Sequence, residues 1–196
     1  VLALTAAALH AGWNLIAKTS GDRDLALIGQ FGVGAVVAAA ILPFTGLPGT
    51  EALPWLLCST VIHVVYVLAL VEAYRHGDFS FAYPVARGGG ALLAAIGGVV
   101  LLDDDVTAGS WVAFTLVAAG LAGLVGTQPT RRSIAWAVIT AVTIGGYTTV
   151  DAHGARISAS GQSYGLTLLV LTGVAVTAVG LVRGRRSAIV ESFPTS

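Results

Sequence analysis

Charged residues are scarce in this sequence of 196 residues. Asp, Glu, Lys and Arg together make up only 10% of it, against about 25% in typical soluble domains. Hydrophobic residues reach 56%, and the mean hydropathy is +0.85. So few charges could not cover the surface of a soluble domain around such an apolar core. A lipid bilayer is therefore the expected solvent.

Cysteine and methionine are also nearly missing. Cys58 is the single cysteine, so the chain can form neither an intrachain disulfide nor a thiolate metal cluster. The chain begins at Val1 and contains no methionine, so we expect it to be part of a longer translation product. The net charge is zero, which favours no nucleic-acid partner. We expect no metal and no cofactor.

The sequence contains long apolar runs with few charged residues. A helix needs about 20 mostly apolar residues to cross about 30 Å of hydrocarbon. Helices are favoured over strands because a continuous apolar run in lipid must satisfy its own backbone polar groups. Seven segments fit, the first as a span cut by the chain start rather than a signal peptide: 1–17, 25–46, 53–74, 80–102, 108–127, 133–151 and 164–182. The predicted fold class is an all-α integral membrane protein, a multi-span helix bundle.

The basic residues are distributed unevenly between the loops. If successive loops lie on alternate sides of the membrane, Arg156 is the only basic loop residue on one side. Arg87 is left out of this count because it lies within a predicted span. The other face carries eight basic residues: Lys18, Arg23, Arg75, Arg131, Arg132, Arg183, Arg185 and Arg186. Because cytoplasmic loops carry the excess of Lys and Arg, this count predicts a plasma-membrane protein with the basic loops in the cytoplasm and the N-terminus outside.

The chain contains a weak internal repeat. A shift of 134 residues places "HAGWNLIAK" (10–18) over "IGGYTTVDA" (144–152). This shift corresponds to five spans with their loops, and because five is odd the second copy enters the membrane inverted. Inverted repeats are common in secondary transporters, whose site lies between the copies. We predict a five-helix repeat over 1–127, followed by a truncated inverted second repeat over 128–196.

The stretch "EAYRHGDFSFAYPVARGGGALLAAIGGVVLL" (72–102) resembles the third-to-fourth helix region of EamA-type proteins of the drug/metabolite transporter (DMT) superfamily. "ALHAGWNLIAK" is similar to the family's opening helix, and "YTTVDAHGAR" (147–156) to the first helix of its second repeat. The resemblance covers nearly the whole chain. It implies ten helices in two inverted repeats, of which this chain would carry about seven, and a permease that exports metabolites.

Two features depart from the family. Its fourth helix often closes with Gly-Glu and a basic residue, whereas this chain has Asp103, Asp104 and Asp105, so no role is transferred to that acidic position. Many members are described with both termini inside, whereas the charge count places the N-terminus of this chain outside. We keep the charge count.

Arg87 is the most unusual charged residue, because apolar sequence continues beyond it. If its helix starts near Ser80, Arg87 lies about 10 Å deep, where a charge costs about 2.5 kcal/mol or more and usually faces a cavity or a partner. If the helix instead starts at Pro84, Arg87 lies at the interface and reaches water. A proline inside the helix would free a carbonyl and kink it, so Pro84 and Gly88 are candidate hinge residues.

Other polar side chains also fall inside predicted spans. His63 lies near the middle of the third span with Tyr66 one turn along, and an imidazole there could relay a proton or bind a substrate. His10 and Asn14 share one face of the first span, beside Trp13, whose partner in the repeat is Tyr147. For each of these residues the alternative is a hydrogen bond between helices that only holds the bundle together.

Two acidic residues have simpler explanations. Glu72 precedes Arg75 by three residues and His76 by four, a spacing that predicts local pairing at a helix end. Asp151 ends the sixth predicted span and is expected to pair with Arg156 or to be solvated.

These patterns support three functional hypotheses. The first is a transporter without enzymatic activity for a small, anionic or amino-acid-like metabolite, with possible proton coupling. Its predicted binding residues are His10, Trp13, Asn14, His63, Tyr66, Arg87 and Tyr147. The second is a membrane-embedded lipid-linked transferase, which would need a cluster of ionisable residues. The third is a non-transporting scaffold subunit, for which buried polar residues are unnecessary.

Overall fold

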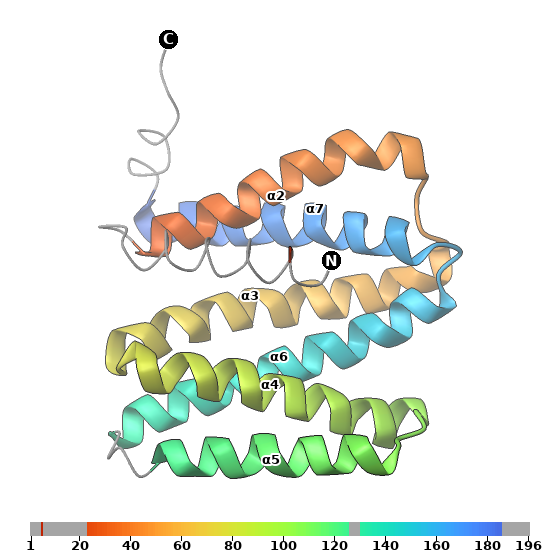
Figure 1. The fold of residues 1–196 in the computed structure, drawn as a ribbon. Coiled ribbons are helices and arrows are strands. Elements are labelled where there is room, and N and C mark those ends of the chain that lie inside the picture. The colour runs from red at the N-terminus through yellow and green to blue at the C-terminus, as the bar shows by residue number, and fades with distance from the viewer. Residues whose placement is uncertain (1–4, 6–22, 126–129, 186–196) are drawn as a thin grey trace.

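The computed structural model describes residues 5, 23–125 and 130–185, and the part of the chain it describes is built of helices (Figure 1). The helices are α2 (Arg23–Thr45), α3 (Leu53–His76), α4 (Phe79–Leu102), α5 (Ala108–Val125), α6 (Arg131–Ile157) and α7 (Gly161–Gly180). A short 3-10 turn (Thr50–Ala52) precedes α3, and a π-helical turn (Leu181–Arg185) follows α7. The predicted all-α membrane bundle is confirmed.

Five of these helices are long and apolar enough to cross a membrane. The predicted second, third, fourth and seventh spans agree with α2, α3, α4 and α7 to within three residues at each end. The fifth, predicted as a full span, is the shorter α5, whose apolar part runs over Ala108–Leu124. The sixth was predicted to end at residue 151 but continues to Ile157. The first, 1–17, lies outside the described residues.

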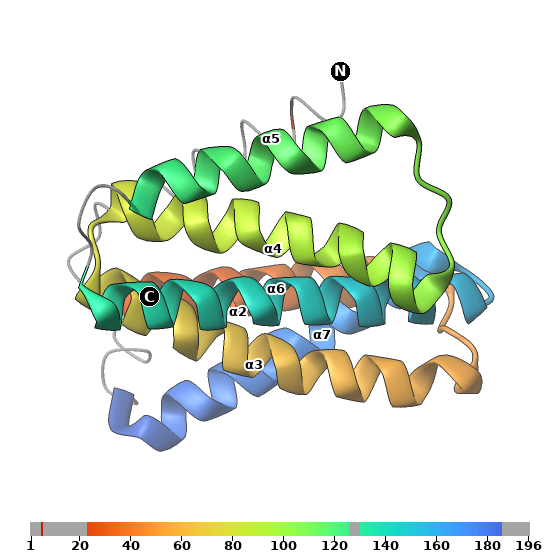
Figure 2. The ribbon, with the colours of Figure 1, turned by 90° about the horizontal axis from the view of Figure 1, so that it is seen from below.

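Each helix packs chiefly on the next in the order α2, α7, α3, α6, α4 and α5 (Figures 1 and 2). The pair α2 and α7 run in opposite directions. In the predicted repeat, a shift of 134 residues places α2 of the first copy at the position of α7 in the second. Corresponding helices of an inverted repeat run in opposite directions, as these two do. The division into two repeats stays a prediction.

Small residues allow the closest helix contacts. A Cβ built on Gly173 of α7 would collide with the Ala35 side chain and the Phe31 carbonyl of α2. Between α4 and α6, a Cβ on Gly145 would lie only 2.6 Å from the Leu93 Cβ. Helices in lipid associate through such close backbone approach, because no hydrophobic effect drives them together.

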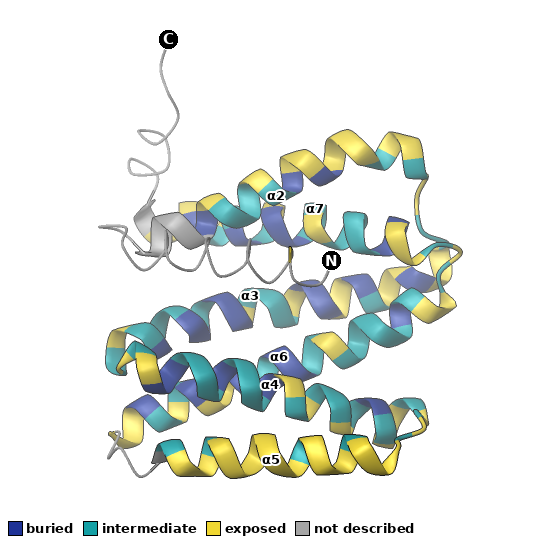
Figure 3. Cartoon of the chain, viewed as in Figure 1, coloured by how far each residue is buried: buried dark blue, intermediate teal, exposed yellow. Residues whose placement is uncertain are grey.

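Large apolar side chains face outward over much of the bundle (Figure 3). Phe44 is 88% exposed and Val112 61% exposed, and α5 is exposed along most of its length. An apolar surface this extensive would promote aggregation in water, and it fits a bundle surrounded by lipid.

Most charged residues of the described chain lie at the two ends of the bundle, whereas Arg87 and Asp151 lie within helices. At one end, α3 and α7 finish and α6 begins, and this end carries Arg75, Arg131, Arg132 and Arg183. Arg156 lies at the opposite end. We call the first end the basic end. Glu72 pairs locally with Arg75 (3.2 Å) and His76 (3.4 Å), which confirms the predicted pairing.

Candidate functional site

Four of the residues singled out in the sequence come together in the middle of the bundle. His63 and Tyr66 project from α3, Arg87 from α4 and Tyr147 from α6. The Tyr147 ring stacks on His63 with 3.9 Å between centroids and meets Tyr66 edge-on at 5.6 Å. Arg87 Nη2 donates a hydrogen bond to the Tyr66 hydroxyl at 3.2 Å. We call these four residues the central cluster.

The start of α4 settles the depth of Arg87. The helix begins at Phe79 and passes through Pro84 without a break, so the alternative start at Pro84 is wrong. Arg87 follows Phe79 by eight residues, which places it about 12 Å along the helix. Proline lacks the N–H that would bond the Ser80 carbonyl.

Arg87 has aromatic neighbours and no carboxylate partner among the described residues. Its guanidinium carbon lies 5.9 Å from the Tyr66 ring centroid, within range of a cation–π interaction. The charge of Arg87 interacts electrostatically with four surrounding tyrosines: Tyr66, Tyr74, Tyr83 and Tyr147. Its Nε is buried and has no hydrogen-bond partner in the described chain. The guanidinium is thus a half-buried cation whose buried Nε–H has no acceptor among the described residues.

His63 is held in a defined tautomer by its own helix. Its Nδ1 lies 3.0 Å from the Ser59 carbonyl and 3.2 Å from the Ser59 hydroxyl. A carbonyl oxygen can only accept a hydrogen bond, so Nδ1 carries the proton. In the neutral ring Nε2 is then the acceptor, and it is the atom that can take up a proton or bind a donor.

Asp151 is not where the sequence suggested. We expected it at a helix end, solvated or paired with Arg156, and this is wrong, because α6 continues for six more residues. The Tyr164 hydroxyl of α7 donates to Asp151 Oδ1 at 3.0 Å, and the Ser59 hydroxyl lies near this carboxylate. Arg156 instead pairs with Asp104 at 2.8 Å.

Ser59 therefore lies between His63 and Asp151, and neither Ser59 nor Tyr164 was among the residues predicted from the sequence. Ser59 precedes His63 by four residues, a spacing that places two side chains on the same helix face, so this contact could have been inferred. Tyr164 carries no such signal, because its contact depends on how α7 folds back on α6. Together these residues extend the central cluster into a row of polar side chains along the bundle.

Ser59, His63 and Asp151 do not form a nucleophilic triad. A triad histidine offers an unprotonated nitrogen to the serine, while the carboxylate holds its other N–H. Here the nitrogen beside Ser59 carries the proton, and the Asp151 carboxylate accepts from Tyr164 and not from the imidazole. The serine hydroxyl is thus left without a base.

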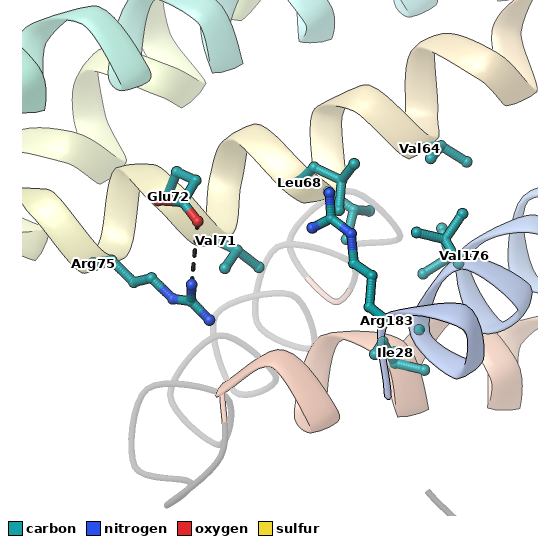
Figure 4. A pocket seen from close by; sticks show the side chains of 11 residues that line it. Ile28, Val64, Leu68, Val71, Glu72, Arg75, Val176 and Arg183 are labelled. Carbon is teal, nitrogen blue, oxygen red and sulfur yellow. Dashed lines mark hydrogen bonds and ion pairs between the residues drawn. The ribbon is translucent and has the colours of Figure 1, made fainter. Parts of the chain in front are cut away.

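In the central cluster, side chain packs on side chain: Tyr66 is buried, and His63, Arg87 and Tyr147 are half-buried. Two cavities among the described helices lie elsewhere. One of about 240 Å³ lies between α2, α3 and α7 at the basic end (Figure 4). The other lies between α7 and the C-terminal end of α2. At 100° per residue, His63 and Tyr66 lie on a different side of α3 from Val64, Leu68 and Val71, which line the first cavity.

Comparisons with protein families, with curated proteins and with solved structures found no match for this chain. No family is assigned. The resemblance to EamA-type proteins stays a prediction.

The remaining predicted residues divide into two groups. His10, Trp13 and Asn14 lie outside the described residues. Gly88 faces α5, since a Cβ built on it would lie 3.1 Å from Leu121 Cδ2, and Pro84 lies one turn before it.

Within the described segments, no three His, Cys, Asp or Glu side chains lie close enough to share a metal ion.

Proposed function

We propose that this chain belongs to a membrane transporter for a small metabolite that carries a carboxylate. In this proposal Arg87 binds the carboxylate, and the rings of Tyr66, Tyr147 and His63 contact the rest of the molecule. The protein lies in the plasma membrane with its basic end in the cytoplasm, and it is not an enzyme. The resemblance to EamA-type exporters favours efflux as the direction.

One observation carries the proposal, namely the charge of Arg87 inside an apolar helix. A charged side chain inside a membrane span costs at least about 2.5 kcal/mol, and such residues usually mark a substrate or ion path. The hydrogen bond that Arg87 donates to the Tyr66 hydroxyl and the cation–π contact with the Tyr66 ring offset only part of that cost, because both groups are neutral. The unpaired Nε leaves Arg87 able to accept an anion. Guanidinium groups bind carboxylates through two parallel N–H donors.

In this proposal a conformational change lets a substrate bind between Arg87 and the rings packed against it. Transporters built from inverted repeats move one repeat against the other around a central site. The free Ser80 carbonyl before Pro84 and the absent side chain at Gly88 weaken α4 where it would have to bend. In our proposal this bend separates Tyr66 from Tyr147 and opens the site.

We also infer proton coupling through Ser59, His63 and Asp151. His63 Nε2 is the acceptor of the imidazole, and the Ser59 hydroxyl lies beside its other nitrogen and near the Asp151 carboxylate. Asp151 accepts from the Tyr164 hydroxyl but has no basic side chain within ion-pair distance among the described residues. A proton can therefore neutralise it. We expect Asp151→Asn to abolish the dependence of flux on a pH gradient while exchange of substrate across the membrane persists.

The alternatives make different demands on the site. A lipid-linked transferase needs a nucleophile or a metal, and the geometry at Ser59 activates no nucleophile. A scaffold subunit gains nothing from an unpaired arginine in the membrane. Turnover of a lipid-linked substrate by the purified protein would revive the first alternative.

The experiment is flux measurement with the full-length protein in proteoliposomes, using a panel of labelled carboxylates and amino acids. We expect Arg87→Ala to lose flux of every transported solute and Arg87→Lys to retain a small part of it, because lysine keeps the charge but lacks the paired donors. Arg156→Ala, at the far end of the bundle, is the matched control. Unchanged flux in Arg87→Ala would remove the proposed role.

A further inference from the structure

The cavity at the basic end has apolar walls. Its volume is about 240 Å³, below the about 300–1,000 Å³ of pockets that enclose drug-sized ligands. Val64, Val67, Leu68 and Val71 of α3 form one wall, facing valines of α7 and Ile28 of α2. Such walls offer no hydrogen bond, so a hydrated polar metabolite would lose free energy on entering. The cavity suits a slender apolar group.

Charged side chains lie only along one border of this cavity (Figure 4). Arg75 pairs with Glu72 there, at 3.2 Å. Arg183, from the turn after α7, has no ion-pair partner among the described residues and reaches toward α3. Among the described residues that line the cavity, two arginines and one glutamate give a net positive charge beside the apolar walls. A ligand that fits both features is apolar along most of its length and anionic at one end.

We propose that this cavity binds an anionic phospholipid of the surrounding bilayer. The upper part of one acyl chain occupies the cavity, and the phosphate lies against Arg183 and Arg75. The location fits, because the cavity lies where membrane-spanning helices end, at the level of lipid headgroups. Basic pockets between such helices are known to hold anionic headgroups on the cytoplasmic side. The site is separate from the central cluster, so it does not depend on the proposed transport function.

The mechanism of selection follows from the two parts of the site. The apolar walls contact any acyl chain equally, whatever its headgroup. The arginines distinguish headgroups, because phosphatidylglycerol carries a net negative charge and phosphatidylcholine does not. Glu72 holds Arg75 at the border of the cavity, and its carboxylate repels a headgroup that carries a second negative charge. We therefore expect preference for a headgroup with a single charge.

The test is native mass spectrometry of the full-length protein with phosphatidylglycerol and phosphatidylcholine of identical acyl chains. We expect tighter binding of phosphatidylglycerol. Arg183→Gln should weaken that binding about fivefold, the effect of one arginine near a membrane surface, and leave phosphatidylcholine binding unchanged. Arg131→Gln removes a charge from the same end but outside the cavity, and it should leave both affinities unchanged.

A second pair of variants tests the walls. Val179→Phe fills the cavity and should weaken binding of both lipids, whereas Val174→Phe adds the same ring on the exposed side of α7 and should not. If Val179→Phe fails to fold, Leu68→Phe fills the same space from α3. The proposal is overturned if the two lipids bind equally, if Arg131→Gln acts like Arg183→Gln, or if the filled cavity binds as before.

Discussion

Replacing Tyr66 by phenylalanine tests whether the Tyr66 hydroxyl holds the Arg87 guanidinium. The change removes one oxygen and keeps the ring, so the contacts with Tyr147 and His63 survive. Tyr66 is only 6% exposed, so water does not readily replace the lost partner. A hydrogen bond to a charged group contributes about 1.5–3 kcal/mol, and bonds between membrane helices fall toward the low end of such ranges. We expect a loss of about 1.5–2 kcal/mol in the free energy of unfolding.

A double-mutant cycle with Arg87→Met separates this bond from other effects. Arg87→Met removes the charge whose burial costs at least about 2.5 kcal/mol. On that background Tyr66→Phe leaves no unpaired group, so we expect it to be nearly neutral. The coupling free energy between the two sites should then be about 1.5–2 kcal/mol.

The assay is reversible unfolding in mixed micelles, followed by circular dichroism. Tyr83→Phe is the matched control, because Tyr83 also lies near Arg87 but its ring stacks on Phe79 at 5.0 Å. A coupling below about 0.5 kcal/mol, within the error of additive sites, would refute the bond between Arg87 and Tyr66. It would also remove the geometric basis of the central cluster.

Two further predictions concern packing and charge. Gly173→Ala should destabilise the bundle by about 1–3 kcal/mol, the usual range for an overpacked core, because its Cβ would collide with Ala35. Gly165→Ala on the same helix meets nothing within 4 Å and should be neutral or slightly stabilising, as unfolding in micelles can measure. The hydrogen bond from Arg156 lowers the pKa of Asp104. The stabilisation from this pair is therefore complete above the ordinary aspartate pKa of about 3.9 and disappears as the pH falls through the lowered value. Carboxyl NMR should show that pKa rising to about 3.9 in Arg156→Gln, and an unchanged pKa would contradict the pairing.

The helix positions could be read from the sequence because apolar runs and their breaks are local signals. The helix α4 ends where Asp103 adopts a left-handed conformation, with φ of 54°. The helix α7 begins where Ser160 caps it by accepting from the Ser163 N–H. The end of α6 was misplaced because Asp151 and Arg156 look like loop residues. Their partners, Tyr164 and Asp104, lie on other segments, so only the three-dimensional arrangement shows why a helix can carry them.

The candidate site was predictable in part for the same reason. A charge or a histidine inside an apolar span is conspicuous in sequence, so Arg87 and His63 could be selected. Their mutual geometry depends on the packing of α6 between α3 and α4, which brings Tyr147 onto His63. The cavity at the basic end left no signal, because its walls consist of ordinary valines.

The most direct test of the central claim observes the Arg87 side chain itself. In the full-length protein in lipid nanodiscs, the Arg87 Nε–H resonance can be followed by NMR during titration with a carboxylate that the protein transports. We predict a saturable shift of this resonance, absent with the corresponding amide, because the unpaired donor acquires an anionic partner. A resonance that does not move while the same solute crosses the membrane would contradict the account.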